Sequence, residues 1–242
     1  MVDTRDTRDT GDTPDAPGIS HPSRVSGGSR PASPTSVELA VATAAERRDL
    51  AAVFEGLSVE QWNSPSLCAG WRVREVVAHM SLGFRCSLPR LGLEAVKARG
   101  SLHRMTDRRA RADAAALSTD ELVAALRDNA EHPWKPPGGP TSALGHDVVH
   151  GLDVTVALGL ERRVPQERLR PLLDAIAPRG LRFFKANLAG VRLCADDLDW
   201  AYGSAADAPL TGAGQDLLLV AFGRRLPPGR LRGEHRDRFT AA

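Results

Sequence analysis

The sequence predicts a mainly α-helical protein, in which a four-helix bundle is followed by a small α+β appendage and preceded by a disordered leader. Three observations support this fold class. Apolar residues between Ser36 and Phe184 recur at helical spacings. Capping boxes and breaks rich in proline and glycine divide that stretch into separate helices. After Ala189 the apolar residues begin to alternate with polar ones, which is typical of strands.

Residues 1–35 are a leader of low complexity. A polar pattern of Asp, Thr and Arg repeats from Asp3 to Thr10, and Gly, Pro and Ser dominate the sequence from there to Pro34. Such a segment has too little apolar surface to offset the entropy cost of ordering the chain. We therefore expect the leader to be disordered.

The first half of the bundle follows the leader. Apolar residues from Leu39 to Leu57 lie mostly three, four or seven positions apart, which indicates a helix with one buried stripe. Ser58 and Gln61 have the spacing of a capping box and begin a short turn of helix. After a loop, a second long helix is expected to open near Trp71.

The second half of the bundle is marked by clear start and stop signals. Ser118 and Glu121 form another capping box, and the segment 133–140, rich in proline and glycine, ends the helix that they begin. The next helix runs to Gly159, and a further amphipathic segment, 166–186, is expected to be split by its proline and glycine. Four long antiparallel helices with such connections favour a four-helix bundle.

The last part of the chain is expected to form a small α+β unit. Residues 191–202 alternate in part and predict a β-hairpin, whereas residues 210–222 are apolar and are expected to be helical. The predicted organisation is therefore a leader (1–35), a helical bundle (36–188) and a C-terminal domain (189–242) that is short for a unit folding alone.

Composition excludes several classes of protein. The chain is 42% hydrophobic and 26% charged, with a net charge of +2 and no segregated basic face, so no nucleic-acid partner is expected. No run approaches the roughly 18 apolar residues of a membrane span, and the N-terminus lacks the apolar run of a signal peptide. We expect a cytoplasmic protein without a membrane partner; the oligomeric state is not indicated.

The three cysteines, Cys68, Cys86 and Cys194, are far apart in the sequence. They form neither a CxxC pair nor a disulfide framework, which fits a reducing compartment. Each is expected to be a small buried hydrophobic residue.

Three histidines form a candidate metal site. His146 and His150 are four residues apart on a predicted helix, so they share one face, and Asp153 lies on the same face as a partner for them or as a plain surface or capping residue. His79 lies at the edge of the buried stripe of another helix, and bundles build metal sites between such inner faces. Three imidazoles suit Zn²⁺, Ni²⁺ or Fe²⁺ and leave a zinc ion one open position. Ordinary surface or core histidines are the alternative.

Three segments then resemble one family. They read LSVEQWNSPSLCAGWRVREVVAHM (57–80), HDVVHGLDVTVALG (146–159) and GVRLCADDLDWAYG followed by LTGAGQDLLLVAFGRR (190–225). They are similar, in this order, to the start, the second metal motif and the small C-terminal domain of the mycothiol-dependent maleylpyruvate isomerase family. That family belongs to the DinB-like metal-binding four-helix bundles, and the resemblance runs in register over residues 38 to 240.

The resemblance implies that His79, His146 and His150 are the ligands of a divalent metal, zinc in this family. In the isomerase itself a glutamate stands at the position of His146, whereas broader DinB-like members have histidine there. Three histidines leave a net charge of +2 on the site, and two histidines with a glutamate leave +1. The more electrophilic metal favours thiolate binding, but the difference leaves the isomerase's own substrate open.

The resemblance also suggests residues around the metal. Trp71 and Arg72 precede His79 by about two turns and are candidates for the pocket that binds thiol and substrate, with core packing as the alternative for Trp71. Arg224 or Arg225 matches the family's arginine after the last apolar helix and is a catalytic candidate that reaches the site from the appendage. A charge that interacts with the helix dipole is the alternative for both.

The leading functional hypothesis is a metal-dependent enzyme that uses a thiol. A low-molecular-weight thiol, mycothiol by resemblance, binds the metal as thiolate and adds to an electrophilic small molecule, which makes the protein an isomerase or S-transferase. No cysteine lies beside a predicted ligand in the sequence, so the cosubstrate supplies the sulfur. Two alternatives stay open: a metal-dependent hydrolase with Asp153 or Asp147 as base, and a non-catalytic metal-binding or regulatory module.

Overall fold

A computed structural model describes residues 33–85 and 101–241 of the chain, and these residues belong to one compact unit. Almost all of the predicted leader, and Cys86, lie outside the described residues.

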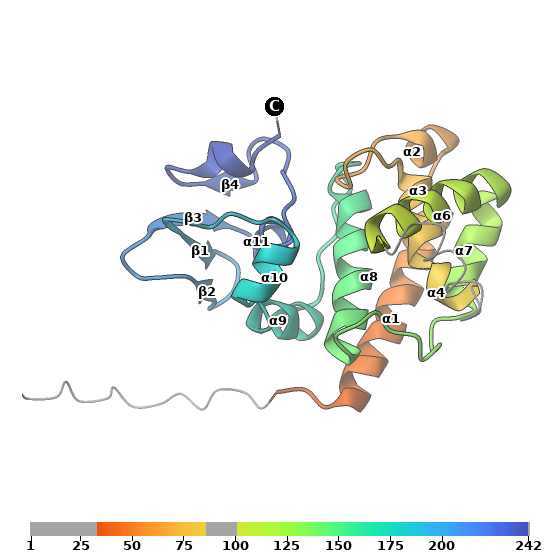
Figure 1. Cartoon of the computed structure of the whole chain (residues 1–242), viewed down its shortest axis with the longest axis horizontal. Helices are drawn as coiled ribbons and strands as arrows, with labels where there is room; N and C mark the ends of the chain where they lie inside the picture. The colour runs from red at the N-terminus through yellow and green to blue at the C-terminus, as the bar shows by residue number, and fades with distance from the viewer. Residues whose placement is uncertain (1–32, 86–100, 242) are drawn as a thin grey trace, which may run out of the picture. The chain divides into compact units, whose positions relative to one another are not determined.

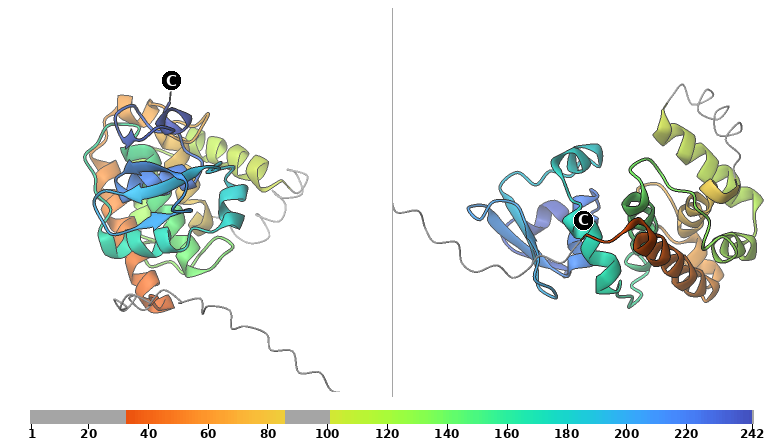
Figure 2. Two further views of the ribbon diagram at one scale, coloured as in Figure 1. Left: turned by 90° about the vertical axis from the view of Figure 1, so that its left-hand side faces the viewer. Right: turned by 90° about the horizontal axis from the view of Figure 1, so that it is seen from below.

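The N-terminal part of the described chain is a helical bundle (Figure 1). Its helices are α1 (Ser36–Glu55), α2 (Val59–Asn63), α3 (Val73–Met80), α4 (Leu82–Arg85), α6 (Leu102–Ala116), α7 (Thr119–Arg127) and α8 (Pro140–Thr155). Helix α1 packs against α8 and α7, and α3 packs against α6 and α8. Figures 1 and 2 show α1 and α8 running side by side. The predicted mainly helical fold is confirmed.

The start signals in the sequence mark real helix starts. Both predicted capping boxes are formed, by Ser58 with Gln61 at the start of α2 and by Ser118 with Glu121 at the start of α7. In each box the serine hydroxyl accepts from the backbone N–H three residues on, which satisfies a donor that the first turn leaves free. Thr35 and Glu38 cap α1 in the same way.

Two helices differ from the prediction. The second helix is not long, because α3 ends at Met80 and the short α4 follows it. The helix that begins at Ser118 is preceded by α6, which was not predicted, since alanine and charged residues fill most of its 15 positions and give it no clear apolar stripe. Helix α6 packs mainly against α3, and α7 packs mainly against α1.

The C-terminal part combines two helices with a small sheet. Its elements are α9 (Gln166–Asp174), α10 (Pro178–Phe183), β1 (Val191–Ala195), β2 (Ala201–Tyr202), β3 (Ala208–Gly212), α11 (Gly214–Ala221), β4 (Leu231–Arg232) and the 3-10 helix η1 (Arg236–Phe239). The strand order is β2-β1-β3-β4, with β1 parallel to β3 and the outer pairs antiparallel. Strands β1 and β2 form the predicted hairpin. The predicted amphipathic segment 166–186 is split into α9 and α10, and α10 begins at Pro178.

The predicted helix at 210–222 is wrong in its first part. Leu210 and Gly212 lie in strand β3, and the helix begins only at Gly214. An apolar run of this kind fits a fully buried strand as well as a helix, and periodicity alone does not separate them. Here Gly212 pairs with Ala195 on one side and Leu231 on the other, so it belongs to the interior of the sheet.

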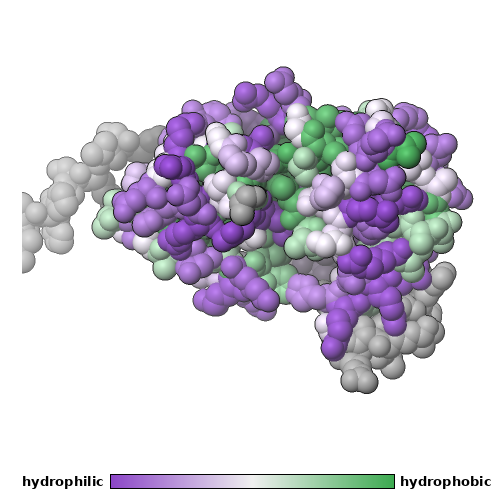
Figure 3. Space-filling view, turned by 90° about the horizontal axis from the view of Figure 1, so that it is seen from above, coloured by the Kyte–Doolittle hydropathy of each residue, from purple (hydrophilic) through white to green (hydrophobic). Residues whose placement is uncertain are grey.

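The apolar core lies in two clusters. One joins α1, α3 and α7 around Phe54 and Val76, and the other joins α8 to α9, α11 and the sheet around Leu152 and Leu217. Hydrophilic side chains cover most of the face in Figure 3, with hydrophobic patches between them. Within residues 33–85 and 101–241, none of the helices is both long and apolar enough to cross a membrane. The domain boundary at 188/189 stays a prediction.

Candidate metal centre

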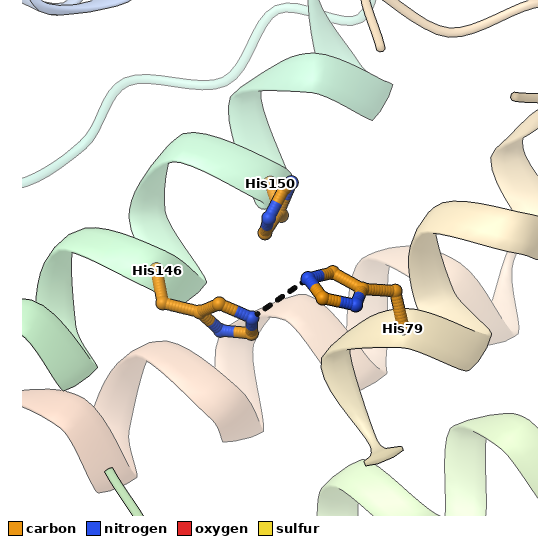
Figure 4. A group of neighbouring side chains, drawn as sticks. All are labelled: His79, His146 and His150. Atoms are coloured by element: carbon orange, nitrogen blue, oxygen red, sulfur yellow. Dashed lines mark hydrogen bonds between the residues drawn. The ribbon is translucent and has the colours of Figure 1, made fainter. Parts of the chain in front are cut away.

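The structure brings the three predicted histidines together. His79 lies in the last turn of α3, and His146 and His150 lie one turn apart on α8. Figure 4 shows the three rings gathered in the space between the two helices. The Nε2 atoms of His79 and His146 are 3.2 Å apart, and one nitrogen from each of the three rings lies within 4.8 Å of the others.

The spacing of His79 and His146 fits one shared cation. Two nitrogen ligands at about 2.0–2.1 Å from a tetrahedral zinc ion lie roughly 3.3 Å from each other. The separation of 3.2 Å between His79 and His146 matches that value closely. All three residues are partly exposed, and the side chains of His146 and His150 are 10% and 14% exposed.

His150 is oriented by a buried carboxylate. Its Nδ1 lies 3.0 Å from Oδ2 of Asp153, whose side chain is fully buried. Arg224, three residues after the end of α11, donates to both oxygens of that carboxylate, at 2.7 and 2.8 Å. Burial by itself raises the pKa of Asp153, but the bonds from Arg224 and His150 hold it well below its usual value. Asp153 is therefore an anion that accepts a hydrogen bond from Nδ1–H of His150, so Nε2 of that ring carries no proton.

His146 has an equivalent arrangement built from another element. Its Nδ1 lies 2.8 Å from Oδ1 of Asp147, and the other oxygen of Asp147 accepts from Nε of Arg47 at 2.7 Å. Asp147 and Arg47 are both buried, and Arg47 comes from α1. Each of the two histidines of α8 is thus hydrogen-bonded through Nδ1 to an aspartate that pairs with an arginine.

His79 differs from the other two ligand candidates. Its Nδ1 is buried and has no hydrogen-bond partner among the described residues. Burial, and then the neighbouring rings of His150 and His146, hold the pKa of His79 well below its usual value. The neutral imidazole is the form that binds metal. In the metal-free protein the polar partner of this ring is His146 at Nε2, and a cation at Nε2 would be a second one.

Two tryptophans lie beside the histidines. The Trp71 ring is 5.2 Å from that of His79, and its Nε1 donates to Asp107 at 2.7 Å. The Trp134 ring is 5.6 Å from that of His146 and packs so closely on Gly83 that a Cβ there would lie 2.1 Å from it. The cluster thus has one aromatic neighbour beside its α3 histidine and another beside an α8 histidine.

The other predicted site residues lie in different surroundings. Arg72 turns toward its own helix and pairs with Glu75 at 2.6 Å, and Arg225 is exposed. Asp153, which the hydrolase hypothesis treats as a base, has both oxygens occupied by Arg224 and His150.

Sequence reasoning missed four residues at this site. Cys68 is distant from the histidines in sequence, but its Sγ lies 3.7 Å from Nδ1 of His150 and donates to Asp153 at 3.0 Å. Burial and then Asp153 raise the pKa of this thiol, so it stays protonated at neutral pH. The other three are Arg47, Asp147 in its pairing role, and Trp134. A polar residue inside an otherwise apolar helical stripe is the one signal that marks Arg47.

Comparisons with known proteins found a family that matches part of the chain. Residues 43–133 match the family described as Mycothiol maleylpyruvate isomerase N-terminal domain. The resemblance seen in the sequence is confirmed, and the matched part contains His79 of α3 and Trp71 beside it.

Two solved structures are similar to the chain over most of its length. One is a mycothiol-dependent maleylpyruvate isomerase, 14% identical with a TM-score of 0.56, over 83% of this chain and 93% of that one. The other is a histidine-to-alanine mutant of a mycothiol-dependent maleylpyruvate isomerase, 14% identical with a TM-score of 0.51, over 77% and 88%. No curated protein sequence matches the chain. At this identity the likeness to the isomerase structures establishes the fold, and the predicted DinB-like bundle is confirmed.

Proposed function

We propose that His79, His146 and His150 bind one divalent metal ion, zinc by likeness to the family, and that the protein is a thiol-dependent isomerase or S-transferase. The observation that carries this proposal is the convergence of three imidazoles from two helices, two of which have their Nδ1 protons engaged by buried carboxylates. That arrangement directs Nε2 lone pairs toward one point, as in metal sites with a hydrogen-bonded outer shell.

The chain's own residues prepare the site for an anion. Asp147 and Asp153 each carry a negative charge, and Arg47 and Arg224 neutralise them, so the full charge of a divalent cation is left on the three neutral histidines. When bound, zinc lowers the pKa of a thiol and holds it as the thiolate. A low-molecular-weight thiol and an electrophile would meet at the exposed edge of the cluster, near Trp71 and Trp134.

A sulfur nucleophile from the protein itself is disfavoured. Cys68 is the cysteine nearest the cluster within the described residues, and its thiol is buried, protonated and bonded to Asp153. The sulfur therefore comes from a cosubstrate, mycothiol by likeness to the family. We also propose that the protein works in the cytoplasm, where such thiols are kept reduced, and that its bundle (36–188) and C-terminal domain (189–242) act together.

The hydrolase alternative has less support. It needs a carboxylate free to accept a proton from water, and the oxygens of Asp147 and Asp153 are bonded to arginine and histidine. No observation in the described chain favours it over the thiol-dependent reaction.

Metal analysis and cobalt spectroscopy test the proposal. Protein purified without chelator is expected to hold about one metal per chain, and His146→Ala protein far less. Adding mycothiol to the Co²⁺ form is expected to produce a sulfur-to-metal charge-transfer band. A metal content near zero would refute the metal site, and a Co²⁺ form whose spectrum is unchanged by thiol would refute the thiol-dependent reaction.

A further inference from the structure

The buried ion pair of Arg47 and Asp147 links α1 to the face of α8 that carries the histidines. Arg47 is 1% exposed and Asp147 is 0% exposed, and Nε donates to Oδ2 at 2.7 Å. The other oxygen, Oδ1, lies 2.8 Å from Nδ1 of His146. Since an ionised carboxylate only accepts, Nδ1 carries the proton and Nε2 keeps its lone pair. Nε2 is the atom that faces His79.

The same guanidinium also holds the segment between α7 and α8. Its Nη1 donates to the carbonyl oxygens of Ala130 and His132, at 3.0 and 2.9 Å. Two residues further along, the ring of Trp134 lies against His146. One arginine thus contacts both the carboxylate behind a ligand candidate and the segment that carries an aromatic neighbour of the site.

Helix packing alone does not require such a pair. Burying two charges is costly, and apolar side chains of similar volume usually hold two helices together as well or better. The second ligand candidate of α8, His150, has a matching aspartate and arginine, but that arginine comes from the C-terminal part of the chain. Two independent constructions of the same arrangement indicate that it serves the histidines.

We propose that Arg47 and Asp147 are positioning residues of the metal centre. Together they keep His146 in the tautomer whose Nε2 is free to bind a cation, and Arg47 also holds the segment that carries Trp134. The metal part of this inference rests on the proposed function, whereas the tautomer is a property of the metal-free protein.

The test replaces both charges at once. In Arg47→Met/Asp147→Leu the pair is exchanged for apolar groups of similar volume, so the variant is expected to fold. Long-range ¹H–¹⁵N NMR of the metal-free proteins reports the tautomer of His146. We expect the Nδ1–H form alone in the wild type and a mixture in the variant. Co²⁺ affinity is expected to fall about 10- to 100-fold, the usual effect of losing an outer-shell partner.

A neighbouring residue of α1 provides the matched control. Arg48 pairs with the exposed Glu131 on the surface, so Arg48→Met is expected to change neither the tautomer nor the Co²⁺ affinity. Asp147→Asn is the conservative variant, because its amide oxygen still accepts from Nδ1–H. It is expected to keep the tautomer, shift the Nδ1–H resonance and lower the affinity less than the double variant does.

The outcomes separate this inference from the proposed function. A double variant with a single tautomer and wild-type Co²⁺ affinity overturns the positioning role. If the double variant does not fold, an unchanged Nδ1–H resonance and unchanged affinity in Asp147→Asn overturn it instead. If the wild type binds no Co²⁺, the proposed metal site fails, and the tautomer measurement still decides whether the pair positions His146.

Discussion

At the residue scale, the three histidines of the cluster are not equivalent. His146 and His150 each donate a hydrogen bond from Nδ1–H to a buried carboxylate, whereas Nδ1 of His79 is buried and unpaired among the described residues. A buried polar atom without a partner costs stability. In the metal-free protein this atom therefore lowers stability, and a cation bound at Nε2 would offset that cost with a bond to the same ring.

This asymmetry predicts that one substitution affects stability little and metal binding strongly. His79→Leu removes the unpaired Nδ1 but also the contact of Nε2 with His146, so the metal-free variant is expected to be about as stable as the metal-free wild type. Its metal affinity is expected to fall by more than the 10- to 100-fold that losing an outer partner costs. Thermal unfolding with and without Zn²⁺ measures both effects. The exposed His103→Ala is the control, and a Zn²⁺-induced rise in Tm as large as that of the wild type in His79→Leu would contradict the assignment.

The same residues predict the direction of the pH dependence. Burial lowers the pKa of both His79 and His150 in the folded protein. Below about pH 6.5 a histidine of the unfolded chain is protonated, whereas these two histidines of the folded protein stay neutral until the pH is lower. The unfolded state then binds more protons, so the free energy of unfolding falls as the pH falls, by at most about 1.4 kcal/mol per pH unit for each histidine.

Urea unfolding of metal-free protein at pH 7.5 and pH 5.5 measures this loss. The wild type is expected to lose more stability over the interval than His79→Leu, which has one fewer depressed histidine. Equal losses in the two proteins would show that His79 titrates normally in the folded state.

At the element scale, the close approach of α1 and α8 supports the histidine face. Gly151 follows His150, and a Cβ there would lie 2.5 Å from Leu50 of α1, which is fully buried. Gly145, on the same helix, would place a Cβ 3.5 Å from Leu172, which is an ordinary contact. Only the first of these two glycines is required by packing.

The two glycines predict opposite changes in stability. Alanine favours a helix over glycine by about 1 kcal/mol, so Gly145→Ala is expected to stabilise the protein. Gly151→Ala gains the same helical preference but overpacks the contact with Leu50, which costs about 1–3 kcal/mol, so a net loss is expected. Chemical denaturation of the two metal-free variants checks the pair. A stabilised Gly151→Ala would mean that α1 and α8 have room to separate.

Elements with strong local signals were predictable from the sequence. The capping boxes at Ser58 and Ser118 fixed two helix starts, and the four-residue spacing of His146 and His150 placed them on one face. Helix α6 and strand β3 were not predictable in this way. Helix α6 lacks an apolar stripe, and the apolar run that contains β3 is compatible with a strand as well as with a helix.

The arrangement around the ligands was out of reach of sequence reasoning for a different reason. Arg47 and Asp147 are 100 residues apart, and Arg224 and Asp153 are 71 apart. The apolar stripe around Arg47 marks it as buried but does not identify its partner, and nothing local to Arg224 distinguishes it from the exposed arginines of the chain. Such pairings follow from how α1 and the segment after α11 pack against α8, which is decided by the whole fold.

At the scale of the whole molecule, Arg224 makes the site depend on the C-terminal part of the chain. It donates to both oxygens of Asp153, contacts the thiol of Cys68 and follows the last apolar helix. Burial opposes the charge of Arg224, but Asp153 outweighs it and raises the pKa of the guanidinium. The orientation of His150 is therefore set by a residue 74 positions further along the chain.

Removing that arginine is expected to weaken folding and metal binding together. Arg224→Met leaves Asp153 buried without its cation, which typically costs about 3–5 kcal/mol, and lets His150 turn, which lowers metal affinity about 10- to 100-fold. Arg225→Met, one residue on and exposed, is expected to change stability by no more than about 0.5 kcal/mol. Urea unfolding and Co²⁺ titration of both variants give the two quantities. A purely structural contact affects folding and leaves the affinity of the folded site unchanged. If Arg224→Met lost stability but kept wild-type Co²⁺ affinity, Arg224 would therefore hold the C-terminal part against α8 without orienting the metal ligand.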